Sequence, residues 1–267
     1  MSAIRPAIRP ALRPAIRSVF GGAGAAPVVW TPASLFAASE VGVWYDPSDL
    51  STLWQDTAGT TPVTAAGQAV ARMDDKSGNG LHITQDTAAN RPLLQTAGGL
   101  YYLDYDGTDD IMTRAAVAGS AWTVIVGASQ DNDATGGLVF GNRTATADRF
   151  GVRLDNSIAA IGHYNGAWLT KSRGSTSGGV PDTSPHVLSA LVSEGSSVTA
   201  YYDGSTMTDT GTPLSNSTDI MAIGGSTTSS YNLDGKVYGI ILRAALSSAE
   251  DFALAQAWIA AKAGVTL

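Results

Sequence analysis

From residue 41 onward, the chain consists of brief apolar or alternating runs that are separated by turn dipeptides. Such runs are typical of antiparallel strands joined by tight turns. The dipeptides are Asn79-Gly80, Asp106-Gly107, Asn165-Gly166, Asp203-Gly204 and Asp234-Gly235. The strands that the pattern predicts cover residues 100–105, 122–128, 149–154, 158–163, 187–192, 198–202, 220–223 and 236–242. Eight or more strands predict an all-β jelly-roll sandwich of two antiparallel sheets.

The composition agrees with one large β domain. The chain has 267 residues, of which 44% are hydrophobic, so it can bury a sizeable core. It contains 30 glycines and only 15% charged residues, which suits short strands and many turns better than a helical protein.

Two short helices are expected outside the strand region. Thr31 and Pro32 have the cap and first-turn preferences of a helix start, which predicts a helix that ends near Glu40. Ser247 and Glu250 have the spacing of a capping box before a terminal helix, which we expect to cover an edge or an end of a sheet. Gly264 stands where that helix should stop. The apolar residues that recur at helical spacing are Phe252, Ala255, Trp258 and Ile259.

Residues 1–26 form a basic segment built on a tetrapeptide repeat, with four arginines and no acid. Proline at successive repeats excludes a helix and favours an extended chain with an apolar face. We expect an anchoring tail that docks on a larger particle; the alternative is a disordered, solvated tail. The anchoring residues are Ile4, Arg5, Pro6, Ile8, Arg9, Pro10, Leu12, Arg13, Pro14, Ile16 and Arg17. The sandwich domain is then residues 27–267, with a leader segment at 27–99 that packs on it.

Charge and cysteine content exclude several classes of function. Outside residues 1–26 the chain carries 12 basic and 23 acidic side chains, a net charge of −11, which opposes general nucleic-acid binding. With no cysteine, the chain has neither disulfides nor a thiolate zinc site. Because no apolar run reaches about 20 residues, we expect no membrane span.

Several segments occur in an order that resembles the laminin-G-like branch of the concanavalin A-like lectin and glucanase superfamily, especially the versions in tailed-bacteriophage and prophage structural proteins. The matching segments are 103–110, 121–124, 186–190, 198–204, 223–225 and 233–237, with leader segments at 42–49, 54–56 and 75–80. The resemblance implies a jelly roll that binds ligands at its strand-end loops. It also implies a place in a virion.

A catalytic pair of the superfamily type is not visible in the sequence. Retaining glucanases of this superfamily place their carboxylates in a Glu-x-Asp-x-x-Glu or Glu-x-Asp-x-Glu pattern on one strand. The chain lacks that pattern, and its only glutamates, which are far apart, are Glu40, Glu194 and Glu250. The histidines lack a zinc-like spacing and are His82, His163 and His186. These observations predict that the protein is not an enzyme.

Two kinds of ligand site remain as candidates. Asp106, Asp109 and Asp110 are close enough in sequence to bind calcium, although the alternative is that they bond turn amides; 131–133 is a second such loop. Glycan binding needs exposed aromatic rings beside polar groups. The residues with that mixture are Tyr164, Asn165, Trp168, Tyr231 and Asn232.

Taken together, the sequence predicts a bacteriophage virion protein: a tail-fibre, tail-tip or decoration component that displays a lectin-like domain for host-surface glycans. The alternative is a glycan-degrading enzyme, a polysaccharide depolymerase of the concanavalin A-like superfamily. Expected partners are other virion proteins and a host glycan, with neither nucleic acid nor membrane. A homo-oligomer, with a trimer as the first guess, and assembly into virions in a host cytoplasm are also expected. Apart from calcium, no cofactor is expected.

Overall fold

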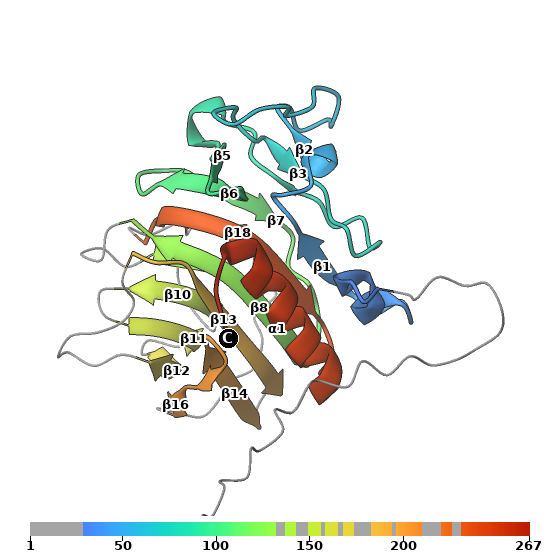
Figure 1. The fold of residues 1–267 in the computed structure, drawn as a ribbon, viewed down its shortest axis with the longest axis vertical. Coiled ribbons are helices and arrows are strands. Elements are labelled where there is room, and N and C mark those ends of the chain that lie inside the picture. Colours follow the sequence, from blue (N-terminus) through green and yellow to red (C-terminus); the bar gives the residue numbers. More distant parts are fainter. Residues whose placement is uncertain are drawn as a thin grey trace, which may run out of the picture. The chain divides into compact units, whose positions relative to one another are not determined.

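A computed structural model describes residues 29–131, 137–142, 149–155, 158–164, 168–173, 183–193, 196–209, 220–225 and 231–267 (Figure 1). The proposed anchoring residues 4–17 lie outside these ranges. The chain divides into two units, Met1–Trp30 and Thr31–Leu267, and the second unit contains all the strands and helices of the described residues.

The first sheet contains the longest strands. Its order is β15-β14-β13-β8-β18-β6-β5, and β1 pairs with β18 as well. All of its pairs are antiparallel. The strands of this sheet are β1 (Gly42–Tyr45), β5 (Leu93–Ala97), β6 (Leu100–Asp106), β8 (Ala121–Gln130), β13 (His186–Ser193), β14 (Ser197–Tyr202), β15 (Ser205–Thr206) and β18 (Asp234–Arg243).

The second sheet has the order β16-β12-β11-β10-β9-β17-β7-β4-β3-β2, again with antiparallel pairs. Its strands are β2 (Leu53–Trp54), β3 (Arg72–Met73), β4 (Ile83–Thr84), β7 (Met112–Arg114), β9 (Gly137–Asn142), β10 (Arg149–Asp155), β11 (Ile158–Tyr164), β12 (Trp168–Arg173), β16 (Thr208–Asp209) and β17 (Met221–Ile223). Alternate residues of both sheets, among them Val126 and Phe140, enclose one apolar core. The predicted two-sheet β-sandwich is confirmed.

Each of the eight strands predicted from the sequence is present, with ends that differ by a few residues. One predicted turn is wrong, however, because Asp234-Gly235 lies at the start of β18. A Cβ atom at residue 235 would lie 2.2 Å from the carbonyl oxygen of Ser129 on the neighbouring strand. The glycine at this position allows two strands to approach closely and is not needed for a turn.

The predicted N-terminal helix is shorter than expected and of a tighter kind. It is the 3₁₀ helix η1 (Pro32–Phe36), which ends at Phe36 and does not reach Glu40. The chain leaves the helix through Ser39, whose φ is +65°, while the Glu40 carboxylate accepts a hydrogen bond from the Ala38 amide at 2.9 Å. Two further 3₁₀ turns are η2 (Leu50–Thr52) and η3 (Ala88–Asn90).

The C-terminal helix α1 (Ala249–Ala263) begins one residue later than the predicted capping box. Its cap is Ser248, whose hydroxyl accepts a hydrogen bond from the Asp251 amide at 3.1 Å and donates to the Asp251 carboxylate at 2.9 Å. Ser248 therefore caps the helix in place of the predicted Ser247. The helix ends at Gly264 with φ +71°, as predicted.

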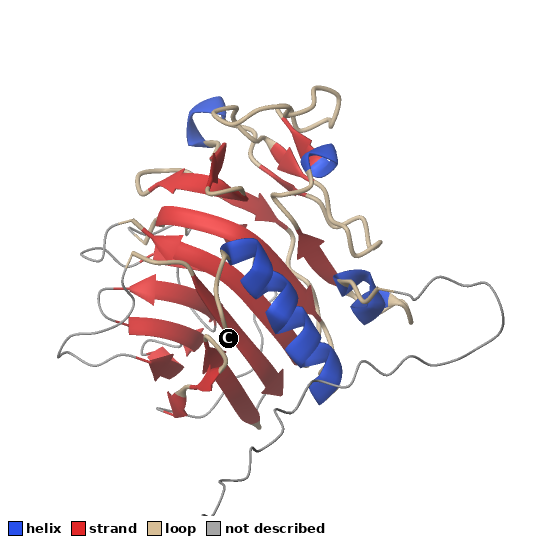
Figure 2. Ribbon diagram, in the orientation of Figure 1, coloured by secondary structure: helices blue, strands red, loops and turns tan. Residues whose placement is uncertain are grey.

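Helix α1 lies across the outer face of the first sheet, over β8, β18 and β13, so the expectation that it covers an edge or an end is wrong (Figure 2). Glycines in the sheet make room for it. A Cβ atom at Gly127 would lie 2.9 Å from Ile259 Cγ2, and one at Gly239 would lie 3.0 Å from Ile259 Cδ1. Among the described residues, no helix is long and apolar enough to cross a membrane.

The same helix is tied to the N-terminal part of the domain. Asp46, which is 2% exposed, accepts contacts from Lys76 Nζ at 3.1 Å and Lys262 Nζ at 3.3 Å. Trp44 and Trp258 meet edge to face at 5.4 Å between ring centroids. A buried carboxylate with two cationic partners is satisfied, so this cluster is a structural tie between β1 and α1.

Gly224 provides a direct test of the packing beneath the β6–β7 turn. Its φ is +87°, and a Cβ atom there would lie 2.1 Å from the ring of Tyr105; Gly67 has a similar φ of +84° but no neighbour within 4 Å. Both Gly→Ala changes cost the strain of a left-handed backbone. We expect Gly224→Ala to lower the free energy of unfolding by about 1–3 kcal/mol more than Gly67→Ala does, because only Gly224→Ala overpacks the core. Urea unfolding of the two variants measures the difference, and equal losses would contradict the packing.

Candidate functional site

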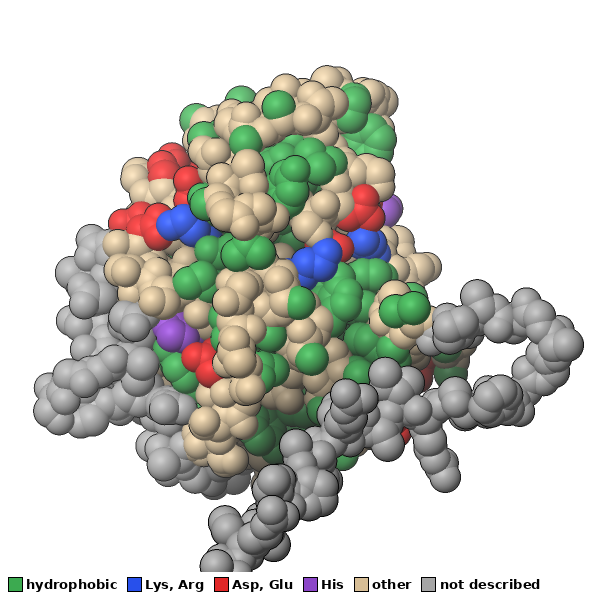
Figure 3. Space-filling model, in the orientation of Figure 1, with side chains coloured by type: hydrophobic (Ala, Val, Ile, Leu, Met, Phe, Trp, Pro, Cys, Tyr) green, Lys and Arg blue, Asp and Glu red, His purple; other side chains and the backbone are tan. Residues whose placement is uncertain are grey.

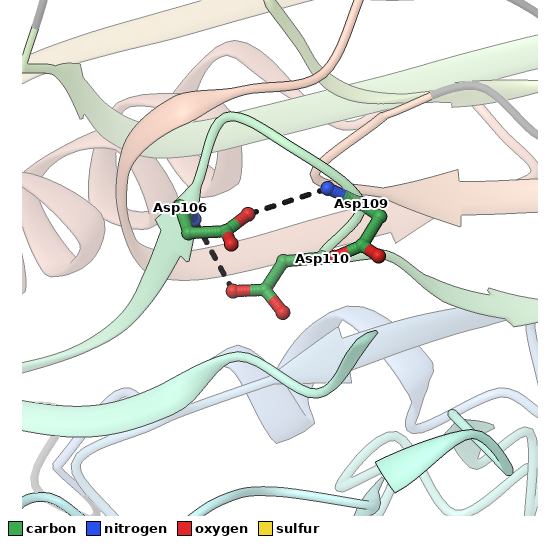
Figure 4. Close-up of side chains that lie close together, drawn as sticks. All are labelled: Asp106, Asp109 and Asp110. Carbon is green, nitrogen blue, oxygen red and sulfur yellow. Dashed lines mark hydrogen bonds between the residues drawn. The ribbon is translucent and has the colours of Figure 1, made fainter. Parts of the chain in front are cut away.

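The turn between β6 and β7 gathers the three aspartates that the sequence singled out for calcium (Figure 4). Asp106 Oδ1 accepts hydrogen bonds from the amides of Thr108 at 2.8 Å and Asp109 at 3.3 Å. The Asp106 amide in turn donates to Asp110 Oδ2 at 3.2 Å. Gly107, with φ +73°, lets the chain reverse direction between them. The aspartates therefore fix this turn, as the alternative reading of the sequence held.

These bonds leave carboxylate oxygens available for a ligand. One atom from each of Asp106, Asp109 and Asp110 lies within 4.8 Å of the other two, and among the described residues this is the one group of acidic or histidine side chains that meets such a criterion. Two oxygens that bind the same calcium ion at about 2.4 Å each are separated by at most about 5 Å. The spacing thus fits calcium, and the three aspartates are the residues that can hold it.

Asp110 differs from its two neighbours in burial and in protonation. Its side chain is buried, at 6% exposed, while Asp106 and Asp109 are exposed. Burial raises the pKa of Asp110 to about 6, and the negative charges of Asp106 and Asp109 add to that rise against the hydrogen bond from the Asp106 amide. A carboxyl group with this pKa exchanges its proton near neutral pH.

Residues 231–232, which the sequence singled out for glycans, lie beside the same turn. The Asn232 side-chain amide donates to the carbonyl oxygen of Thr108, and the Gly107 amide donates to the carbonyl oxygen of Leu233 at 3.0 Å. Tyr231 is 36% exposed. The guanidinium of the buried Arg153 lies 5.0 Å from the centre of its ring. The structure therefore joins two groups that are more than 120 residues apart in the chain.

Further charged side chains extend the site over the outer face of the first sheet. Strand register places Asp234 opposite Asp106 and Lys236 opposite Asp104. Lys236 Nζ contacts the Asp131 carboxylate. Figure 3 shows acidic side chains, in red, next to basic atoms, in blue, at the upper left of the domain. Asp106, Asp109, Asp110, Tyr231 and Asn232, with the surrounding Asp104, Asp131, Asp234, Lys236 and Arg153, are called the acidic end below.

The pKa values on this face reflect burial and mutual repulsion. Burial raises the pKa of Asp104, and the charges of Asp131 and Asp234 raise it further. The pKa of Asp234 is raised by burial and by Asp131 and Asp106. Burial acts to lower the pKa of Lys236, but its contact with Asp131 and the nearby Asp104 outweigh that effect and raise it. Excess negative charge is therefore a property of the whole end.

The sequence predicted only some of the residues of this site. Arg153, Asp104 and Lys236 carried no local signal because they stand inside predicted strands. Asp131 is the first residue of the loop 131–133 that the sequence proposed as a second calcium site, and its carboxylate contacts Lys236. Residues 132–133 lie outside the described residues.

The remaining candidate residues lie elsewhere or have structural partners. Tyr164 and Trp168 are opposite each other in the β11–β12 hairpin, but their side chains and Asn165 lie outside the described residues. His82 Nδ1 lies 2.9 Å from an Asp74 oxygen, and His186 Nδ1 lies 2.7 Å from Asp203 Oδ2.

Comparison with known proteins gives the fold and no family. No family model and no curated protein matches the sequence. Domain 4 of the extracellular GH43 arabinanase AbnA from Geobacillus stearothermophilus, solved with arabinotriose, matches with a TM-score of 0.54 and 11% identity over 83% of this chain and 97% of that one. A mutant GH54 α-L-arabinofuranosidase soaked with 4-nitrophenyl α-L-arabinofuranoside matches with a TM-score of 0.58 and 14% identity, over 87% of this chain and 65% of that one.

Trypanosoma rangeli sialidase matches with a TM-score of 0.53 and 12% identity over 86% of this chain. The present chain covers only 34% of the sialidase chain, so it spans about a third of the length of that enzyme. At these identities the likeness establishes a shared β-sandwich.

These matches contradict two expectations from the sequence, that the protein is a bacteriophage virion component and that it is not an enzyme. The matched structures are a sialidase, an arabinofuranosidase and a domain of an arabinanase. The sequence argument against an enzyme rested on the absence of a glutamate pattern on one strand. A glycosidase needs two facing carboxyl groups, and aspartates in a turn can supply them as well.

The raised pKa of Asp110 predicts how stability depends on pH. The folded protein holds this proton up to about pH 6, whereas the unfolded chain loses it near the ordinary aspartate value of 3.8. Protonated Asp110 therefore contributes to the stability of the folded protein below about pH 4, and this contribution is lost as the pH rises through 6. Above that pH the ionised carboxylate lowers the free energy of unfolding by on the order of 1–3 kcal/mol relative to the protonated form. We expect Asp110→Asn to raise the free energy of unfolding at pH 8 and to change it little at pH 4.

Urea unfolding at pH 4, 6 and 8 measures this effect. Asp86→Asn, which removes an exposed carboxylate elsewhere, serves as the control and should leave the difference between pH 4 and pH 8 as it is in the parent protein. If Asp110→Asn destabilises the protein equally at all three pH values, the buried carboxyl group does not carry the raised pKa.

Proposed function

We propose that this chain is a glycan-degrading enzyme whose β-sandwich contacts its glycan at the acidic end. The observation that carries the proposal is the sandwich shared with the sialidase, the arabinanase domain and the arabinofuranosidase. The acidic end supports it, because the exposed Tyr231 precedes Asn232, which bonds the turn of the three aspartates, and burial raises the pKa of Asp110 in that turn to about 6. These are the components that sugar binding and glycosidic hydrolysis need.

In this proposal Asp110 and Asp106 form the catalytic pair. Asp110, with a pKa of about 6, donates its proton to the glycosidic oxygen as the bond to the anomeric carbon breaks. The Asp106 carboxylate attacks that carbon from the opposite side, so a glycosyl ester forms as the bond to the glycosidic oxygen breaks. One oxygen of each lies within 4.8 Å of the other, so the pair does not have the wider spacing of about 6.5–9.5 Å found in inverting enzymes. Asp110 then takes a proton from a water molecule whose oxygen attacks the anomeric carbon, so the bond to Asp106 breaks and the sugar is released.

Tyr231 and Asn232 would hold the sugar beside this pair. A ring backed by a guanidinium is fixed in place, and its exposed part can stack on the apolar face of a sugar. The Asn232 carbonyl and the Asp109 carboxylate can accept hydrogen bonds from sugar hydroxyls. The resemblance to laminin-G-like domains supports this location, since it implies binding at strand-end loops.

Hydrolysis of glycans by purified protein tests the proposal. We expect release of reducing ends from at least one polysaccharide of an arabinan, xylan, galactan and bacterial exopolysaccharide panel. Asp110→Asn should lower the rate by at least about 100-fold, because the amide cannot donate an acidic proton. Glu250→Gln, an exposed change on α1, should leave the rate unchanged. Activity that survives Asp110→Asn would remove this residue from the mechanism.

A second candidate function is glycan binding as a module of a larger glycan-degrading enzyme. The arabinanase match favours it, because the present chain covers 97% of a single domain that was solved with an oligosaccharide. Binding without release of reducing ends would distinguish this function from hydrolysis. Both functions place the glycan at the same end of the sandwich.

Substitution of Tyr231 tests the contact that both functions share. We expect Tyr231→Ala to weaken glycan binding by roughly 5–150-fold, as loss of one stacked ring costs about 1–3 kcal/mol. Tyr231→Phe keeps the ring and should bind nearly as well as the parent. Isothermal titration with the best-bound oligosaccharide gives both values, and unchanged affinity in Tyr231→Ala would place the glycan elsewhere.

A further inference from the structure

The outer face of the second sheet carries a partly exposed tryptophan at its β2 edge. Leu53 belongs to the buried core, so Trp54, the next residue of β2, points to the outer face. The indole Nε1 of Trp54 donates a hydrogen bond to Asp74 Oδ2 at 2.8 Å, which fixes the orientation of the ring. Because the ring is also partly open to solvent, Trp54 is a flat apolar platform for a ligand.

Polar side chains on the adjacent strands surround this platform. Strand register pairs Trp54 with Arg72 of β3, and Arg72 with Thr84 of β4. Arg72 Nε donates to Asp74 Oδ1 at 2.6 Å, and His82 Nδ1 lies 2.9 Å from the same oxygen. The side chain of Arg72 is 22% exposed and that of His82 is 34% exposed. One carboxylate, that of Asp74, therefore holds an indole, a guanidinium and an imidazole together at the surface.

Hydrogen-bonding groups of these side chains remain available to a ligand. Within the part of the chain that the structure describes, no residue forms a hydrogen bond with Arg72 Nη2, His82 Nε2 or the Thr84 hydroxyl. The register continues to the partly exposed Thr113 of β7 and then to Ala222, which is fully buried. The accessible row thus runs from β2 to β7 and presents N–H and O–H groups beside a flat ring.

The guanidinium of Arg72 is held in place from a second side. Gly59 has φ +74°, and a Cβ atom there would lie 3.2 Å from Arg72 Cζ, so the missing side chain lets the guanidinium lie against the loop backbone. Groups that are fixed before binding lose little conformational entropy when a ligand arrives. The charge of Arg72 is already offset by Asp74, so the site offers hydrogen bonds to hydroxyl groups and not an unpaired positive charge.

Tyr231 lies on the same outer face. Val152 and Leu154 belong to the buried core, so Arg153 between them points outward, and its guanidinium lies 5.0 Å from the centre of the Tyr231 ring. The strands that carry Arg153 and Trp54, β10 and β2, are six steps apart in the sheet order, which corresponds to about 25–30 Å. A trisaccharide is too short to span this distance, whereas a long glycan can reach both rings.

We propose that Trp54, Arg72, His82 and Thr84 form a second glycan-binding site. The apolar face of a sugar ring stacks on the indole, and its hydroxyl oxygens accept hydrogen bonds from the neighbouring polar groups. The inference rests on the proposed function for its class of ligand and adds a separate site to it. Two sites on one face hold a long glycan more tightly than either site alone, because binding at one raises the effective concentration at the other.

Isothermal titration with arabinotriose, xylotriose and cellotriose tests the second site. We expect the best-bound trisaccharide to occupy two sites on the parent protein, and Trp54→Ala and Tyr231→Ala each to leave one. Trp54→Phe keeps an aromatic ring and should retain both sites. The control is Trp258→Ala, which removes another partly exposed indole, on α1, and should also retain both sites in the folded protein.

A second variant keeps the test decisive if Trp54→Ala does not fold. His82→Ala leaves the ring in place and removes one hydrogen bond, so it should weaken binding at this site by about 2–10-fold. A single site that is lost in Tyr231→Ala and unaltered in Trp54→Ala and His82→Ala would overturn this inference and leave the proposed function standing. A single site with the reverse response would support this inference and remove the glycan from the acidic end. If none of the three trisaccharides binds, both proposals are wrong.

Discussion

Antiparallel pairing of β18 with both β6 and β8 determines what the acidic end can be. The register sets Asp234 against Asp106 and Lys236 against Asp104, and the absence of a side chain at Gly235 lets β18 approach the Ser129 carbonyl closely. Strand pairing over this length is stabilised by hydrogen bonds and by the core beneath it. Carboxylates that repel one another are therefore held together by forces that do not depend on their charges.

The outer face of the first sheet is divided between two uses. Over its middle, Gly127 and Gly239 have no side chains, so helix α1 packs close to the sheet and Ile259 occupies the space above the two glycines. Beyond the helix, Tyr102 and Tyr238 form a tilted pair at 5.4 Å, next to Lys236. The helix thus protects the apolar part of the face and leaves the charged strand ends open to solvent, which is where an all-β sandwich can acquire binding residues without disturbing its core.

The sequence predicted the strands well because period-two patterns and turn dipeptides record burial directly. Prediction from the sequence was wrong where one pattern can have two physical causes. Asp234-Gly235 has the pattern of a turn, but it lies at the start of β18, where the missing side chain of Gly235 lets the neighbouring strand approach closely. The sequence also could not join Asp106 with Tyr231 and Asn232, since only sheet topology brings residues so distant in the chain together. The sequence singled out the three aspartates and the pair Tyr231 and Asn232 separately. Their proximity and the positions of Arg153 and Lys236 follow only from the three-dimensional fold.

The sequence argument against an enzyme has a related weakness. The number of glutamates says little about catalysis, because the surroundings of a carboxyl group set its pKa. Burial and neighbouring negative charges raise the pKa of Asp110 to about 6. Asp106, at the other end of the same turn, is exposed, and its carboxylate accepts hydrogen bonds from two backbone amides. Two residues of the same type thereby become chemically different. The difference between Asp106 and Asp110 depends on the turn that Gly107 allows and on the packing of Gly224 against Tyr105. The chemistry of the β6–β7 turn is therefore determined by the backbone contacts beneath it.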